Sequence, residues 1–134
     1  MTKYNEIPKI KSAVVVDEDL YVLFENGDIK KLSINTFKEL GININTKEFS
    51  NIYVSPFSVV WKKLNYEVGH DSIFDLGQTV NLSPVSVILL RKSQNISRRK
   101  LAQKLNVSES EISQLESGKK TNLKLLQKIF STLL

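Results

Sequence analysis

A chain of 134 residues with 41% hydrophobic and 25% charged residues has the size and balance of one soluble domain or two small ones, and no apolar run approaches the roughly 20 residues of a membrane span. It has no cysteine and a single histidine, His70, so we expect a cytoplasmic protein without a metal site, a cofactor or catalytic residues. The net charge of +5 is uneven, because residues 1–82 carry −2 and residues 83–134 carry +7, which indicates that the second part binds a polyanion or, alternatively, presents a solvated basic face.

The first third of the chain has the composition of β-strands. β-Branched residues predominate over 10–16, and an apolar run over 20–24 leads into a turn that contains Asn26 and Gly27. Because an Asn-Gly pair supplies the positive φ angles of a tight hairpin turn, residues 29–34 are expected to return as the partner strand. The sequence therefore predicts an antiparallel hairpin.

Shorter elements are expected after the hairpin. Asn35 and Thr36 are candidate caps for a short helix over 37–40, which Gly41 would end. Further short elements are expected, in chain order, as strands over 49–54, 58–61 and 66–68 and as one helical turn over 71–77.

These elements make residues 1–77 a small, mostly β domain with short helices. Its expected role is dimerisation, ligand sensing or binding of a partner protein. Residues 78–83 are expected to form a linker. From residue 84 to 134 the apolar period becomes helical, so the second domain is expected to be all α and the whole chain to be of the α+β class.

Four helices are predicted in the second domain from their caps and apolar spacing. Two of them are short and are joined by a turn at Asn106 and Val107, which is the form of a helix-turn-helix. Asn106 is suited to the left-handed conformation of such a turn. The predicted helices are 84–93 after Ser83, 98–105 after Ser97, 109–116 after Ser108 with Glu111 completing a capping box, and a fourth that Thr121 or Asn122 caps.

The segment from Leu101 to Lys119, LAQKLNVSESEISQLESGK, closely resembles the Cro/XRE phage-repressor family. Ala102 is small where the two helices would cross, and the apolar positions expected in the core are Leu101, Leu105, Val107, Ile112 and Leu115. The resemblance extends over 85–133 and implies a lambda-repressor-like helix-turn-helix domain that binds double-stranded DNA.

Carried over residue by residue, the resemblance makes 109–116 the recognition helix, with its N-terminal end in the major groove. Gln114 would pair with adenine, and Glu109 would accept a hydrogen bond from cytosine. The residues expected to contact bases are Ser108, Glu109, Ser110, Ser113 and Gln114. Those expected to contact phosphates are Arg98, Arg99, Lys119 and Lys120.

Two features depart from the family pattern. Glu109 and Glu111 place negative charge on the recognition helix, where they either oppose the DNA or simply stabilise the helix N-terminus. The family's fifth helix, which often joins two copies, has no counterpart among the four expected helices. The expected homodimer therefore needs another surface, either the first domain or an apolar group that could equally pack within the chain: Ile88, Leu89, Leu125 and Leu134.

The first domain resembles, more loosely, a small bacterial domain of unknown function that occurs alone or ahead of such a helix-turn-helix. The residues that carry this resemblance are 8–10, 21–28, 49–54, 60–61 and 73–74. That family has no activity to carry over. Trp61, Tyr53 and Phe57 would either line a ligand pocket or belong to the core.

We therefore expect a sequence-specific DNA-binding transcriptional regulator, acting as a dimeric repressor or autoregulator. An enzyme is not expected, because His70 and Asp71 are adjacent residues without a marked nucleophile nearby. The alternative is a protein-binding adaptor or antitoxin, in which the first domain holds a partner protein and the helix-turn-helix is secondary.

Overall fold

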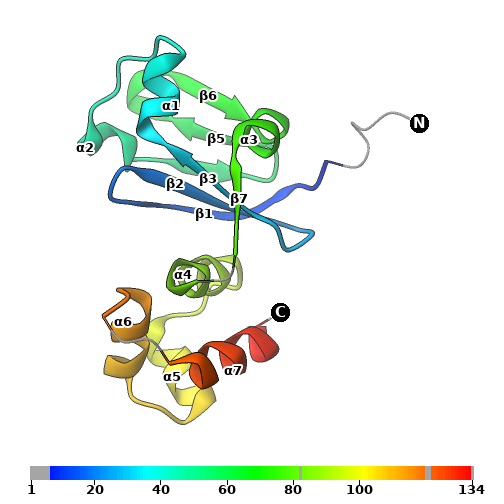
Figure 1. The fold of residues 1–134 in the computed structure, drawn as a ribbon, viewed down its shortest axis with the longest axis vertical. Helices are drawn as coiled ribbons and strands as arrows, with labels where there is room; N and C mark the ends of the chain where they lie inside the picture. Colours follow the sequence, from blue (N-terminus) through cyan, green and yellow to red (C-terminus); the bar gives the residue numbers. More distant parts are fainter. Residues whose placement is uncertain (1–6, 82, 120–121, 134) are drawn as a thin grey trace. The chain divides into compact units, whose positions relative to one another are not determined.

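The computed structural model describes residues 7–81, 83–119 and 122–133 and divides the chain into two compact units, Met1–Asn81 and Leu82–Leu134 (Figure 1). The first unit contains all the strands and several short helices, and the second contains only helices. The protein is therefore of the predicted α+β class. No helix in the described ranges is both long and apolar enough to cross a membrane.

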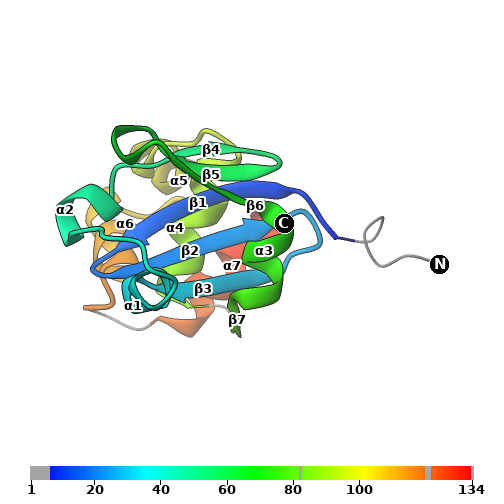
Figure 2. The same cartoon turned by 90° about the horizontal axis from the view of Figure 1, so that it is seen from above.

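The first unit contains a four-stranded antiparallel sheet in the order β1-β2-β3-β7. Figure 2 shows its first three strands side by side. They are β1 (Ile10–Val16), β2 (Asp19–Phe24) and β3 (Ile29–Ser33), which confirms the predicted strands and hairpin. The hairpin turn differs from the prediction in one detail: of the Asn26-Gly27 pair, only Gly27 has a positive φ, 92°. Asn26 instead accepts the amide of Asp28 on its side-chain oxygen at 3.0 Å.

The fourth strand, β7 (Gln78–Val80), pairs with β3, so the prediction of a linker is wrong for these three residues. The strand is short and mostly polar, and its stability comes from pairing with a segment far away in the sequence. Lys30, opposite Thr79 in the ladder, donates from Nζ to the Thr79 hydroxyl at 2.7 Å. Such a partner cannot be recognised from the local pattern of an edge strand.

The second sheet is antiparallel in the order β4-β5-β6. Its strands are β4 (Tyr53–Ser55), β5 (Ser58–Trp61) and β6 (Tyr66–Gly69), and a 3-10 turn, η2 (Lys62–Leu64), connects the last two. The strands expected over 58–61 and 66–68 are thus confirmed. The strand expected over 49–54 is wrong for residues 49–52, because Phe49 ends the helix α2 (Thr46–Phe49) and β4 begins only at Tyr53. Asn45 and Glu48 form a capping box that stabilises this helix.

Two further helices complete the first unit. Helix α1 (Ile34–Glu39) begins earlier than predicted, because Ser33 rather than Asn35 or Thr36 is its cap. The helix ends before Gly41, as predicted, and this glycine has a φ of 88°. Helix α3 (His70–Leu76) occupies the position of the predicted helical turn.

The core of the first unit is centred on stacked aromatic rings. Trp61 is 1% exposed, and its indole nitrogen donates to the Phe49 carbonyl at 2.8 Å. The ring of Phe37 packs against the rings of both Phe49 and Trp61. By contrast, Tyr53 and Phe57 are 53% and 55% exposed, so these two residues do not line a pocket with Trp61. Trp61 is therefore a core residue, while Tyr53 and Phe57 belong to the surface.

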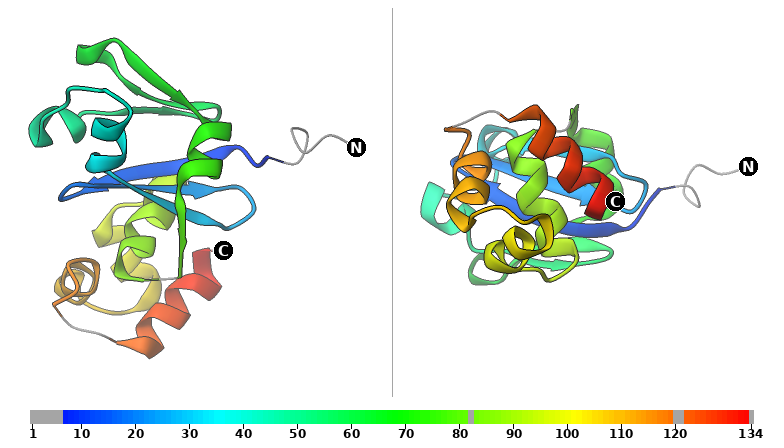
Figure 3. Two further views of the ribbon diagram at one scale, coloured as in Figure 1. Left: turned by 45° about the horizontal axis from the view of Figure 1, so that its top comes forward. Right: turned by 90° about the horizontal axis from the view of Figure 1, so that it is seen from below.

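The second unit consists of four helices, which Figure 3 shows from two sides. They are α4 (Pro84–Ser93), α5 (Arg98–Leu105), α6 (Glu109–Glu116) and α7 (Leu123–Leu133), as predicted. Asn122 caps α7, since its side-chain oxygen accepts the amide of Leu125 at 3.1 Å, whereas Thr121 lies outside the described residues. The buried apolar residues of this unit include Val87, Leu90, Leu101, Ala102, Leu105, Ile112, Leu115, Leu126 and Ile129.

Candidate nucleic-acid interface

The turn between α5 and α6 is held by local hydrogen bonds. Asn106 takes the left-handed conformation, with φ 57° and ψ 45°. The next residue, Val107, donates its amide to the Ala102 carbonyl at 3.0 Å, and this ends α5. Ser108 then opens α6 by accepting the amide of Glu111 on its hydroxyl oxygen at 3.1 Å. At each end of the turn, a backbone amide finds its hydrogen-bond acceptor within a few residues. This explains why the local sequence predicts the turn.

Helix α6 has one buried face and one exposed face. Ile112 and Leu115 are 0% and 1% exposed, and both belong to the core. The five residues predicted to contact bases lie at its start and along the other face: Ser108, Glu109, Ser110 and Ser113 are exposed, and Gln114 is half-buried. The helix thus presents a continuous polar surface. That surface is the candidate base-reading face.

The two glutamates near the start of α6 differ in their contacts. Glu111 accepts from the amide and the hydroxyl of Ser108 at 3.4 and 3.3 Å, so it completes the predicted capping box. The Glu109 side chain makes no hydrogen bond or ion pair with another described residue and is exposed. Glu111 is therefore occupied in helix capping, and Glu109 is the acidic side chain that remains available on this face.

The basic residues predicted to contact phosphates lie at two places. Arg98 and Arg99 are exposed at the start of α5, and Lys119 is exposed just after α6. Lys120 lies outside the described residues. Arg98 differs from the others, because its Nε donates to Glu116 Oε1 at 2.8 Å while its side chain remains 48% exposed.

Glu116, the last residue of α6, is a functional candidate that the sequence prediction missed. Only 6% of it is exposed, and its carboxylate accepts hydrogen bonds from two arginines on other helices, Arg91 and Arg98. One signal was present in the sequence. Glu116 follows Ile112 by one helical turn on the buried face, and a carboxylate at an inward position needs a cationic partner.

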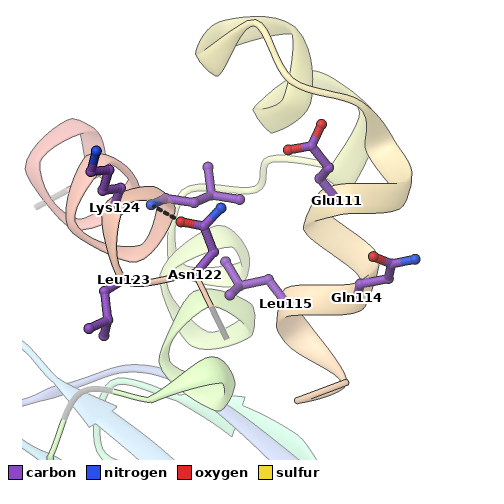
Figure 4. Close-up of a pocket in the computed structure, with 7 residues that line it drawn as sticks. Glu111, Gln114, Leu115, Asn122, Leu123 and Lys124 are labelled. Atoms are coloured by element: carbon purple, nitrogen blue, oxygen red, sulfur yellow. Dashed lines mark hydrogen bonds between the residues drawn. The ribbon is translucent and has the colours of Figure 1, made fainter. Parts of the chain in front are cut away.

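A groove of about 760 Å³ lies between α6 and the start of α7. Its walls come from Glu111, Gln114 and Leu115 on one side and from residues 122–125 on the other. In Figure 4, Leu115 faces toward Asn122, whereas the amide of Gln114 points away from α7. The Gln114 amide therefore lies on the side of α6 that faces away from α7.

Comparison with protein families agrees with the helix-turn-helix geometry. A solved structure of a candidate DNA-binding protein from Nitrosomonas europaea ATCC 19718 is 14% identical to this chain, with a TM-score of 0.40 over 91% of this chain and 83% of that chain. A comparison with curated proteins found no match. Residues 87–133 match the family model described as Helix-turn-helix. The presence of a helix-turn-helix domain supports DNA as a partner of this protein. Residues 87–133 are thus a helix-turn-helix domain of the Cro/XRE type.

Proposed function

We propose that the protein binds specific sequences of double-stranded DNA as a transcriptional regulator, with α6 in the major groove. One observation carries this proposal. The polar residues of α6 form its exposed face, while Ile112 and Leu115 hold the helix against the core. A short polar helix presented in this way by a helix-turn-helix matches the dimensions of the major groove.

The contacts divide into two kinds in this proposal. Gln114 and Glu109 read base edges, with adenine and cytosine as their preferred partners, and Ser108, Ser110 and Ser113 add hydroxyl contacts. The four basic residues contact phosphates and set the register of the protein on the duplex: Arg98, Arg99, Lys119 and Lys120. The net charge of +7 on residues 83–134 supports this division.

We further propose that the protein acts as a homodimer, either as a repressor of other genes or as an autoregulator. Leu89 and Leu125 are 0% and 6% exposed, so they are not accessible for an interface between two copies. Ile88 is half-buried, and Leu134 lies outside the described residues. The first unit offers an exposed apolar group, which consists of Tyr53 and Val54 on β4 and of Phe57 in the turn after it. A dimer formed through the first unit would let two helix-turn-helix domains read two half-sites.

The decisive experiment is selection of bound fragments from genomic DNA with the full chain, followed by fluorescence anisotropy on the enriched duplex. We expect enrichment of one sequence pattern and an affinity that falls steeply with salt concentration. A pseudo-palindromic pattern, together with a dimer mass in light scattering, would support the homodimer. Absence of enrichment together with absence of salt-dependent binding would refute the proposal.

A protein-binding adaptor or antitoxin is the second candidate function. The exposed aromatic side chains of Tyr53 and Phe57 favour it, because exposed aromatic residues are enriched at protein interfaces. In this case, affinity purification from the source cell would yield one stoichiometric partner protein, and the full chain would not bind duplex DNA at low salt.

A further inference from the structure

Two arginines share the buried carboxylate of Glu116 in different ways. Arg91 donates from Nε to Oε2 at 2.5 Å and from Nη2 to Oε1 at 2.9 Å, and its Nη1 donates to the Ile96 carbonyl at 3.0 Å. All three nitrogens of Arg91 are thus engaged, and its side chain is only 12% exposed. Arg98 approaches the same carboxylate from the start of α5 and donates only from Nε.

The terminal nitrogens of Arg98 make no hydrogen bond with another described residue, and its side chain is 48% exposed. Two positive charges face one negative charge in this cluster, so a full positive charge is left over. The guanidinium of Arg98 is therefore held at one nitrogen and is accessible at the other two. Such a fork can bind a second anion in a fixed orientation, which a lysine ammonium cannot do.

We infer that Glu116 is a positioning residue for DNA binding: it holds the guanidinium of Arg98 so that the two terminal nitrogens bind a phosphate of the duplex. The inference rests on the proposed function, since it assumes that the helix-turn-helix binds DNA. It concerns a residue that is itself buried and touches no base or phosphate. An arginine that is oriented before binding loses less side-chain freedom when it contacts the phosphate.

The positioning role and simple electrostatics predict opposite changes in DNA affinity when Glu116 loses its charge, so an experiment can separate them. Glu116 is negative, and the DNA is a polyanion. If only net charge mattered, Glu116→Gln would raise DNA affinity, since it adds one unit of positive charge to the domain. If Glu116 positions Arg98, the same variant lowers affinity, because the guanidinium loses its charged anchor.

A double-mutant cycle in the full chain tests this, with affinity measured by fluorescence anisotropy on a short mixed-sequence B-form duplex. Phosphate contacts are independent of sequence, so no operator is needed. We expect Glu116→Gln to lower affinity about tenfold in the wild-type background. In the Arg98→Ala background it should not lower affinity further. Thermal unfolding of each variant reports whether the second unit is still folded.

An equal loss in both backgrounds would overturn the inference, because a merely structural role of Glu116 does not depend on Arg98. A gain in affinity for Glu116→Gln would overturn it as well. If the wild-type chain shows no salt-dependent binding to the duplex, the proposed function itself fails, and that outcome is distinct because it appears before any variant is compared.

A second comparison decides the matter if Glu116→Gln does not fold. Arg98→Lys retains the positive charge but removes the fork that joins Glu116 to a phosphate, whereas Arg99→Lys is a matched control at an exposed residue without an ion pair to a described residue. We expect a loss of about tenfold for Arg98→Lys and a much smaller change for Arg99→Lys. Wild-type affinity of Arg98→Lys would overturn the inference.

Discussion

Arg91 binds the carboxylate of Glu116 with two nitrogens, at 2.5 and 2.9 Å, and so joins the end of α4 to the end of α6. The two side chains are 12% and 2% exposed, so solvent screens this pair weakly. A buried carboxylate that loses its main partner is costly, because the charge remains without full compensation.

The first prediction follows from this pair. Arg91→Ala should lower the free energy of unfolding of the second unit by about 3 kcal/mol, as measured by denaturant unfolding. Arg99→Ala is the control, because Arg99 is exposed, and its effect should stay within about 0.5 kcal/mol. Equal effects of the two substitutions would show that the buried pair does not stabilise the unit.

The second prediction concerns the turn between α5 and α6. Asn106 has a φ of 57°, a conformation that costs about 1 kcal/mol for a residue with an ordinary side chain and nothing for glycine. Asn106→Ala should therefore unfold at a lower denaturant concentration than Asn106→Gly. The Gly variant should also retain DNA affinity better, since α6 keeps its orientation. Indistinguishable unfolding midpoints would contradict the role assigned to this conformation.

The third prediction separates base contacts from phosphate contacts. Gln114→Ala should weaken binding to the selected duplex by about 1–3 kcal/mol and leave binding to a scrambled duplex nearly unchanged. Arg99→Ala should weaken both equally and reduce the slope of log affinity against log salt by about 1. Anisotropy titrations of the two variants on the two duplexes give the four affinities that are needed. Equal losses on both duplexes for Gln114→Ala would remove this residue from the base-reading face.

The fourth prediction tests the close approach at Gly77, between α3 and β7. A Cβ atom there would lie 2.7 Å from Lys30 Cβ and 2.8 Å from the Ile73 carbonyl oxygen. Gly77→Ala should therefore destabilise the first unit by about 2 kcal/mol, in the range of overpacking in a tight site. Ser72→Ala, at an exposed position on α3, is the control and should be nearly neutral. A Gly77→Ala protein with wild-type stability would mean that β7 has room to move away.

The helices of the second unit could be predicted almost residue by residue because their ends depend on local hydrogen bonds. Ser97 accepts the amide of Lys100, and Ser108 accepts that of Glu111, so each cap joins residues three positions apart. The polar face of α6 follows from the same helical period. The positions predicted to contact bases could therefore be placed on its start and outer face from the sequence, although their contacts with DNA remain a prediction.

The first unit was predicted less completely because its elements depend on distant partners. Residues 78–80 form β7 through pairing with β3, which is almost fifty positions away. The composition of residues 49–54 predicts a strand, but the capping box of Asn45 and Glu48 places Phe49 at the end of a helix. Its ring then stacks on Trp61, which further favours the helical arrangement.

The amino-acid sequence alone determined the helix-turn-helix, its caps and the uneven charge, since each of these depends on neighbouring residues or on composition. Only the tertiary structure decided what Arg98 does within the protein. From the sequence it is one of several basic residues at a helix start. In the fold it meets the carboxylate of Glu116, eighteen positions away, which burial and the bidentate pair with Arg91 keep in place.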